Sequence, residues 1–272
     1  MGVLHILRMW RFSVIDNYEA FKAQILSLTR IDLHSYKERQ MKRRIDALIA
    51  KHKIDSYNVY VETIKRNPVM FEEFINYLTI NVSEFYRNPE QWNLLEREIL
   101  PYLFSKFGNQ LKIWSAACST GDEPYSLVML LSKFLPLSRI KIIATDIDKQ
   151  VLSKAKLGLY NIKSLKGLPD EFLSKYFHEI NDKTYQISDS IKQCVEFKQH
   201  NLLKDEYPSH CDLIVCRNVL IYFTEEAKDN IYKKFNQSLK KDGILFVGST
   251  EQIIQPQNLQ FITHKSFFYR KM

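Results

Sequence analysis

The sequence predicts a doubly wound α/β domain with a small β insertion, preceded by an all-helical domain. Short apolar runs alternate with amphipathic segments from residue 111 onward, whereas apolar residues recur at helical spacing between residues 17 and 79. A third observation concerns size, since 272 residues with 45% apolar side chains can bury a full core. We therefore expect one large domain with a smaller attachment.

Six apolar runs are the predicted strands of a parallel sheet. They cover residues 111–116, 140–145, 195–199, 213–217, 244–249 and 266–270. Amphipathic segments at 125–135 and 225–241 separate them, which predicts helices on both faces of the sheet. Within the stretch from about 160 to 194, HEINDKTYQIS resembles a hairpin around Asp182 and predicts a small β subdomain.

The predicted domain boundaries follow the change of pattern. Residues 1–79 form the helical domain, 80–110 a linker that includes a helix at 92–103, and 111–272 the α/β domain. The apolar residues Met70, Phe74 and Leu78 illustrate the helical spacing before the first boundary.

A basic helix is predicted at residues 37–53, KERQMKRRIDALIAKHK. Its apolar residues share one face, and its cations cover the rest of the surface; the apolar residues are Met41, Ile45, Leu48 and Ile49, and the cations include Lys37, Arg39, Lys42, Arg43, Arg44 and Lys51. The net charge of +8 favours a polyanionic partner, which is nucleic acid, an anionic membrane surface or an acidic protein face. A solvated helix face is the alternative interpretation of this segment.

Composition excludes several classes of protein. The four cysteines are scattered without a CxxC pair or a nearby histidine, so no metal site is expected and free thiols indicate a reducing compartment. The opening apolar run is too short for a secretory core, and no later stretch could insert into a membrane. We expect a cytoplasmic protein, monomeric because no large exposed apolar stripe is found.

The loop after the first predicted strand, SAACSTGDEPYS, leads directly into a helix. It retains only Gly121 of a glycine-rich loop, so a dinucleotide fingerprint is absent. Asp122 and Glu123 follow, and a carboxylate there repels phosphate but suits a cationic amino group. The alternative is that both acids only stabilise the first turn of the helix through its dipole.

Two further strand ends carry polar residues. Asp146 ends the second strand, twenty-five residues after Gly121, where doubly wound folds keep an acid that accepts ribose hydroxyls. The segment CRNVLIYF places Arg217, Asn218 and Tyr222 at the same carboxyl edge of the sheet. No Ser, His and Asp set or metal cluster stands out, so hydrolysis has little support.

Six motifs together resemble the chemotaxis receptor glutamate methyltransferases, the CheR family, in order and spacing. They are TINVSEFYRN (79–88), IWSAACSTGDEPYS (113–126), ATDID (144–148), HNLL (200–203), CRNVLIYF (216–223) and LFVGSTEQI (245–253). The resemblance extends from about residue 17 to 272. It implies a Rossmann-like domain that uses S-adenosyl-L-methionine, a small β subdomain and an all-helical N-terminal domain that docks on receptors.

The resemblance also implies a set of cofactor-binding residues. Asn81, Ser83 and Arg87 would reach the cofactor from the linker, Glu123 would bind its amino end and Asp146 its ribose, while Asn201, Leu202, Asn218 and Val219 would line its adenine and methionine sides. Ser83 stands where other members have Thr, and Asp122 where many have Glu, so Glu123 is favoured as the direct contact. An additional family arginine near the methyl group has no secure match here, with Arg97 a candidate, and a receptor tail held by the β subdomain cannot be inferred.

The activity implied is transfer of the methyl group to glutamate carboxylates of chemoreceptors, leaving methyl esters and S-adenosyl-L-homocysteine. The expected partner is the cytoplasmic methylation region of methyl-accepting chemoreceptors, docked by Lys37, Arg39, Lys42, Arg43 and Arg44. A glutamate with a pKa near 4.3 is ionised at pH 7 and needs no general base. Tyr222 would orient it by a hydrogen bond, unless Tyr222 is only a packing aromatic.

Two competing interpretations belong to other classes. A nucleic-acid methyltransferase would suit the positive charge, but the DPPY-like loop expected for adenine amines is missing where CRNVLIYF stands. No nucleic-acid partner is therefore expected. An inactive module that binds the cofactor and only docks on receptors is the other alternative, and the presence of Tyr222 with the full cofactor set argues against it.

Overall fold

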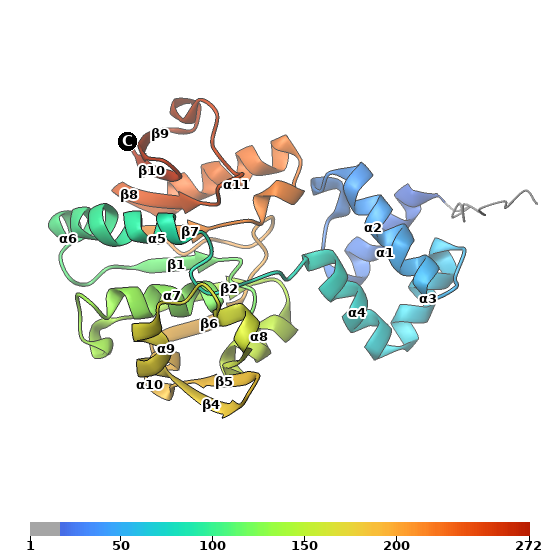
Figure 1. Cartoon of the computed structure of the whole chain (residues 1–272). Coiled ribbons are helices and arrows are strands. Elements are labelled where there is room, and N and C mark those ends of the chain that lie inside the picture. Colours follow the sequence, from blue (N-terminus) through green and yellow to red (C-terminus); the bar gives the residue numbers. More distant parts are fainter. Residues whose placement is uncertain (1–16) are drawn as a thin grey trace, which may run out of the picture. The chain divides into compact units, whose positions relative to one another are not determined.

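The computed structural model describes residues 17–272, which form two compact units that divide between Leu78 and Thr79 (Figure 1). The opening segment, which the sequence analysis judged too short for a secretory core, lies outside the described residues. No helix in the described part of the chain is long and apolar enough to cross a membrane.

The first unit is helical throughout its described part. It contains α1 (Tyr18–Thr29), η1 (Leu33–Ser35), α2 (Glu38–Lys51), α3 (Tyr57–Arg66) and α4 (Pro68–Thr79). The side chain of Asn17 caps α1 by accepting a hydrogen bond from the Glu19 amide, and Ser56 caps α3 in the same way. Side-chain caps thus begin two of the helices of this unit.

Aromatic residues fill the core of the helical unit. The rings of Phe21 and Tyr57 lie 4.7 Å apart, and Phe74 packs edge-on against both Phe21 and Tyr60. Helix α2 turns its apolar face inward as the sequence predicted, which leaves its basic residues on the remaining surface.

The second unit is built on a mixed seven-stranded sheet in the order β6-β2-β1-β7-β8-β10-β9. Its strands are β1 (Ile113–Ala116), β2 (Ile142–Asp146), β6 (Val195–Gln199), β7 (Cys211–Cys216), β8 (Leu239–Val247), β9 (Phe261–Lys265) and β10 (Phe268–Lys271). The strands from β6 to β8 in this order are parallel. The doubly wound fold predicted from the sequence is therefore confirmed.

Two details of the sheet differ from the prediction. Strand β10 is antiparallel to both neighbours, because a short turn joins it to β9 and a parallel pair would need a crossover of a dozen residues or more. Strand β9 lies at the edge of the sheet and was missed because its sequence, FITHK, has only two apolar residues and forms no apolar run. The predicted helix at 225–241 ends at Ser238, and its last residues begin β8.

Helices cover both faces of this sheet. They are α5 (Pro89–Leu94), the π-helical η2 (Leu95–Ile99), α6 (Leu100–Phe107), α7 (Asp122–Leu131), η3 (Leu137–Arg139), α8 (Lys149–Leu157), η5 (Leu220–Tyr222), α11 (Glu225–Ser238) and η6 (Pro256–Leu259). Segments α5 to α7 pack on one face in a core with Ile113 and Val215. Helix α8 lies on this same face, where Leu152 packs with Ala144 and Tyr125 of α7 donates a hydrogen bond to Ala155 O. On the other face, Phe235 of α11 meets Trp114. Residues 89–107 are thus part of the core of this unit.

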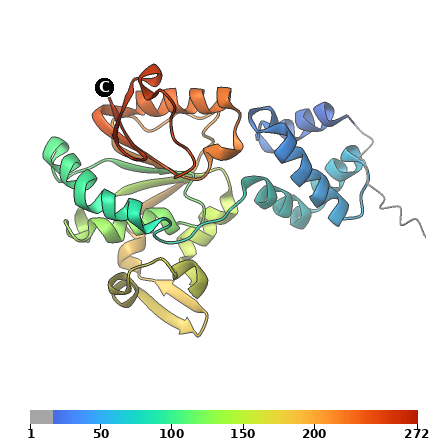
Figure 2. The same ribbon diagram turned by 45° about the horizontal axis from the view of Figure 1, so that its top comes forward.

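A three-stranded antiparallel sheet interrupts the chain between α8 and β6. It consists of β3 (Leu159–Asn161), β4 (Phe177–Asn181) and β5 (Thr184–Ile187), with η4 (Ile162–Leu165), α9 (Asp170–Tyr176) and α10 (Asp189–Lys192) beside the strands. The hairpin around Asp182 is confirmed, and in Figure 2 it projects from the larger sheet as a yellow ribbon. Phe85 attaches the linker here, since its ring contacts Tyr160 and Phe177 edge-on.

The order of the strands creates a switch point at β1. The chain leaves β1 for β2 on one side, and later returns to β7 on the other. Ligands of doubly wound folds bind outside the carboxyl ends of the strands at such a point. The loops after β1, β2 and β7 are therefore the place to look for a site.

Candidate cofactor and active site

The loop after β1 is strained and tightly packed. Ala117 and Ser119 have left-handed backbone with φ of 63° and 48°, which costs on the order of 1–3 kcal/mol for each non-glycine residue. Gly121 has φ of 89°, and a Cβ there would lie 2.9 Å from the Cβ of Ala155, so glycine is required by both conformation and space. The loop thus delivers the first turn of α7 to the sheet edge in one fixed path.

Asp146 at the end of β2 holds this loop. Its carboxylate accepts hydrogen bonds from the Ser119 amide at 2.8 Å and the Asp148 amide at 3.0 Å. Burial raises the pKa of Asp146 to about 6, and these backbone hydrogen bonds oppose the increase. A carboxylate has about four acceptor positions, so capacity remains for hydroxyl groups of a ligand.

The two acids at the start of α7 have different surroundings. Asp122 is 1% exposed and accepts hydrogen bonds from the hydroxyls of Thr120 and Ser83. Glu123 accepts a hydrogen bond from Ser115 Oγ at 2.8 Å, and burial raises the pKa of Glu123 to about 7. Because Asp122 is satisfied by the protein, the geometry supports Glu123 as the acid that meets a ligand.

Arg217 is the charged partner of Glu123, with its Nη1 3.9 Å from Oε2 of that residue. Its Nη2 donates to Arg87 O, Asn88 Oδ1 and Gln91 Oε1, and its guanidinium lies over the ring of Phe246 at 4.6 Å. The side chain is nearly inaccessible, and the neighbouring charge of Glu123 lowers the cost of burying it. Arg217 therefore binds the linker to the end of β7.

The linker is also held from the β2 side. Asn81 donates to Asp148 Oδ2 at 2.9 Å, and Asp148 caps α8 by accepting from the Gln150 amide. Arg87 hydrogen-bonds to Val82 O at 3.4 Å and is close enough to Glu123 to lower the pKa of that acid. Asn81, Ser83 and Arg87 thus lie beside the loops of the sheet edge.

Asn201 and Leu202 follow β6, the neighbour of β2. The His200 amide donates to Asp146 O, which joins this segment to the end of β2. Asn201 Oδ1 accepts from the Leu203 amide at 2.9 Å, and Leu202 is largely buried. Both residues therefore begin a turn next to Asp146.

The loop after β7 carries Asn218, Val219 and Tyr222. Asn218 has left-handed backbone with φ of 61°, and Tyr222 is half-buried at the end of the 3-10 turn η5. The amides of Asn218 and Val219 donate to the carboxylate of Glu251. The predicted cofactor residues thus lie on the linker, at the end of β2, in the first turn of α7 or on loops at one edge of the sheet.

Some residues with evident roles were not among the predicted site residues. The sequence predicts Arg217 only as a polar residue at the carboxyl edge of the sheet. A cation that directly follows a buried strand is, however, a signal of a functional role. Asp148 and Glu251 lie within the motifs ATDID and LFVGSTEQI, but nothing in the sequence shows that their partners are backbone amides and a linker asparagine. Arg97 is exposed on η2, and Arg87 and Arg217 are the guanidinium groups near Glu123.

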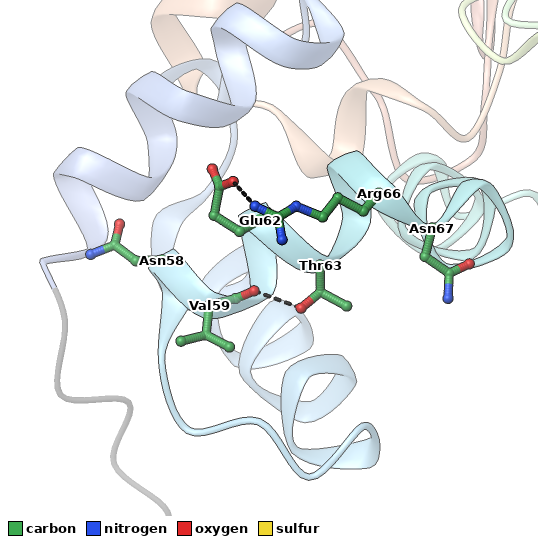
Figure 3. Close-up of a pocket in the computed structure, with 6 residues that line it drawn as sticks. All are labelled: Asn58, Val59, Glu62, Thr63, Arg66 and Asn67. Carbon is green, nitrogen blue, oxygen red and sulfur yellow. Dashed lines mark hydrogen bonds and ion pairs between the residues drawn. The ribbon is translucent and has the colours of Figure 1, made fainter.

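A surface pocket of about 540 Å³ lies beside α3 in the helical unit (Figure 3). It is lined by Asn58, Val59, Glu62, Thr63, Arg66 and Asn67. Figure 3 shows the ion pair between Glu62 and Arg66 and the hydrogen bond from Thr63 to Val59 O. None of these described lining residues belongs to the predicted cofactor site, and no set of catalytic groups converges there.

Comparison with known proteins identifies the class. The description "CheR methyltransferase, SAM binding domain" matches residues 81–268, and "CheR methyltransferase, all-alpha domain" matches residues 16–79. The second unit is therefore an S-adenosylmethionine-dependent methyltransferase. The chain belongs to the CheR methyltransferase family, and its cofactor is S-adenosylmethionine.

Two relatives have names that agree with this assignment. The chain is 42% identical to the "Chemotaxis protein methyltransferase" of Listeria monocytogenes serovar 1/2a over 89% of this chain and 92% of that protein. It is 33% identical to the protein of the same name from Borreliella burgdorferi, over 85% of this chain and 86% of that protein. Among solved structures, PKMT2 from Rickettsia typhi in complex with AdoHcy is 21% identical over 54% of this chain and 24% of that chain, with a TM-score of 0.35.

The residues at the sheet edge fit this cofactor. Glu123 and Asp146 are buried acids with raised pKa values, and a ligand with a cationic amino group and ribose hydroxyls would supply the favourable partners that burial removed. The alternative, that Glu123 only stabilises the dipole of α7, does not account for its ion pair with Arg217.

We predict that Asp146→Ala weakens binding of S-adenosylhomocysteine by about 1.5–3 kcal/mol, because ribose hydroxyls lose a charged acceptor. Isothermal titration calorimetry measures the affinity. Asp182→Ala, in the exposed hairpin turn, is the control and should bind like the wild type. Unchanged affinity in a folded Asp146→Ala protein would remove Asp146 from the site.

We predict that affinity for S-adenosylhomocysteine decreases as pH falls below 7. The ionised carboxylates bind the amino group and the hydroxyls, so binding lowers their pKa values and releases protons. Protonation of Glu123, with a pKa of about 7, should weaken binding by roughly tenfold per pH unit below that value, and Asp146 adds to the loss near pH 6. Calorimetry at pH 6.5 in buffers of different ionisation enthalpy should show proton release, which Glu123→Gln should reduce.

Proposed function

We propose that this protein transfers the methyl group of S-adenosylmethionine to glutamate side chains of chemoreceptors, producing glutamate methyl esters and S-adenosylhomocysteine. The observation that carries the proposal is the grouping of the predicted cofactor residues around one sheet edge together with Tyr222. The names of the relatives, which refer to chemotaxis, support a receptor as the substrate.

The chemistry places few demands on the protein. Bound S-adenosylmethionine supplies an electrophilic methyl group on a sulfonium centre. A glutamate side chain is already ionised at neutral pH, so the protein has to orient the carboxylate and exclude water from it. Such positioning supplies up to roughly 7–11 kcal/mol of the barrier reduction.

Tyr222 is the proposed group that orients the incoming carboxylate. It lies at the end of η5, four residues after Asn218, and is half-buried at the same edge as the cofactor residues. A phenolic hydroxyl donates a hydrogen bond to an anion without competing as a nucleophile at neutral pH. The packing role considered above for Tyr222 predicts no effect when only the hydroxyl is removed.

The docking surface that we propose is the exposed part of α2 together with its N-cap residue Lys37. Lys37, Arg39 and Arg43 are exposed, and a partner rich in glutamate would be attracted to them. Two other residues of the predicted docking set are used inside the unit. Lys42 forms an ion pair with Asp46 at 2.9 Å, and Arg44 donates to Tyr77 O at 2.7 Å.

One assay tests the reaction. Labelled S-adenosylmethionine is offered with a receptor cytoplasmic fragment or with RNA, and the product is treated with base. Release of label from the receptor fragment by base indicates a methyl ester. Base-stable label on RNA would indicate a nucleic-acid methyltransferase instead, and binding of cofactor without transfer would indicate an inactive docking module.

We predict that Tyr222→Phe lowers kcat while affinity for S-adenosylhomocysteine stays within about twofold, because a contact made mainly in the transition state affects turnover. Steady-state methylation at saturating cofactor and receptor measures the change. Tyr102→Phe is a matched control, since its hydroxyl donates to Asp242 O away from the sheet edge. A wild-type kcat for Tyr222→Phe would contradict the role.

We predict that Lys37→Glu, Arg39→Glu and Arg43→Glu together raise the apparent KM for receptor about tenfold or more at low salt, because attraction between opposite charges increases association. Added salt should reduce the difference, as screening shortens the Debye length to about 3 Å at 1 M. Affinity for S-adenosylhomocysteine should not change.

A second triple variant controls for net charge. Lys53, Lys65 and Arg66 are exposed cations of the same unit outside α2, and their replacement with Glu gives the same net charge. An equal increase in KM in both variants would show that total charge, and not the surface of α2, affects receptor binding.

A further inference from the structure

Glu251 is a buried acid for which the reaction described above has no use. It follows β8 in the motif LFVGSTEQI and is 5% exposed. A buried carboxylate is costly unless it is hydrogen-bonded, so its partners indicate what it does in the fold.

All four hydrogen bonds to this carboxylate come from backbone amides. Oε1 accepts from Val219 at 2.9 Å and Leu220 at 2.6 Å, and Oε2 accepts from Asn218 at 2.5 Å and Gly248 at 2.9 Å. The first three amides belong to consecutive residues of the loop after β7. Hydrogen bonds to an ionised acceptor are about twice as strong as neutral ones, so the loop is held firmly.

The backbone of this loop has the shape of an anion-binding nest. Asn218 is left-handed with φ of 61°, and Val219 is right-handed with φ of −118° and ψ of −38°. A left-handed and a right-handed residue in succession turn consecutive amides toward one point, which then attracts an anion. In this protein the anion is the side chain of Glu251, more than thirty residues further along the chain.

The structure leaves little room for Glu251 to move. A Cβ on Gly248 would lie 2.5 Å from Oε2 of Glu251 and 2.9 Å from the amide of Asn218, so the chain passes close to the nest at this glycine. The Glu251 amide donates to Gly248 O at 3.0 Å, and Tyr232 donates to Glu251 O at 3.2 Å. The carboxylate is therefore fixed on both sides.

We propose that Glu251 is a positioning residue for methyl transfer, which fills the nest and thereby sets the path of residues 217–222. The turn η5 begins at Leu220 and has no side-chain cap of its own, so the carboxylate of Glu251 serves as its cap. Through that turn Glu251 orients Tyr222. Through the backbone of Asn218 and Val219 it sets the positions of two residues predicted to contact the cofactor. The proposal rests on the function proposed for this edge of the sheet.

The charge and both oxygens of Glu251 are needed for this role. A glutamine has the same size but offers one acceptor oxygen, and its amide nitrogen would face backbone amides that also donate. An alanine would leave the nest without an anion, and a small anion from solution could enter it. The two substitutions therefore test the same contact in different ways.

Asp212 supplies a matched control. It is a buried carboxylate near the opposite end of β7, where it accepts from the Lys112 amide at 2.7 Å and pairs with Lys240 at 2.8 Å. Asp212→Asn should lower the melting temperature without affecting the loop after β7. A general loss of stability is thereby separated from a loss of positioning.

The first measurement is amide hydrogen exchange of the protein without cofactor or receptor. In Glu251→Gln the peptide that contains residues 218–220 should exchange at least tenfold faster, while the amides within β7 remain protected. Asp212→Asn should leave the exchange of residues 218–220 unchanged. Wild-type exchange at these residues in Glu251→Gln would overturn the proposal, and this readout is independent of any methylation activity.

The second measurement is turnover at a temperature where every variant is folded. Glu251→Gln and Glu251→Ala should lower kcat for receptor methylation at least tenfold, with a smaller decrease in affinity for S-adenosylhomocysteine. Sodium formate should restore part of the turnover of Glu251→Ala in a saturable manner, and sodium chloride at equal ionic strength should not. A loss of kcat no greater than that of Asp212→Asn would overturn the proposal, as would equal responses to formate and chloride.

Discussion

The buried guanidinium of Arg217 is the interaction on which the arrangement of the site depends. An isolated charge inside a protein is strongly unfavourable, so Arg217 is stable there only while its acceptors stay in place. Those acceptors belong to the linker, through Arg87 O and Gln91, and to α7, through Glu123. Loss of any one of them would leave the cation under-compensated. The linker, the first turn of α7 and the end of β7 are therefore fixed relative to one another by a single side chain.

A well-packed sheet supports strained loops at the same edge. Ala117, Ser119 and Asn218 have left-handed backbone, an unfavourable conformation for residues other than glycine. Two of these positions are held by buried carboxylates, because Asp146 accepts from the Ser119 amide and Glu251 from the Asn218 amide. The central strands β1 and β7 are buried on both faces and contribute hydrophobic stability that offsets this strain.

The sequence predicts those parts of the structure that depend on the local pattern of apolar and polar residues. Apolar runs predicted six strands, because buried strands are rich in apolar residues. The alternation of these runs with amphipathic segments predicted the doubly wound class. The half-exposed β9 left no such signal, and the antiparallel course of β10 depends on a turn. Motifs indicated Glu123 and Asp146 as candidates. The role of Arg217 could not be predicted, since its acceptors are mainly backbone and side-chain oxygens more than 120 residues earlier in the chain.

Charge balance explains why the site that we propose for an anionic substrate contains so many acids. Glu123 and Asp146 would repel the proposed glutamate substrate if both were ionised without a partner, and burial already raises their pKa values. A cationic cofactor favours their ionised forms and at the same time compensates their charge. The carboxylate of Glu251 is compensated by four backbone amides, which occupy it fully. Cofactor binding is therefore expected to favour approach of the proposed substrate, because the bound cofactor adds positive charge beside these acids.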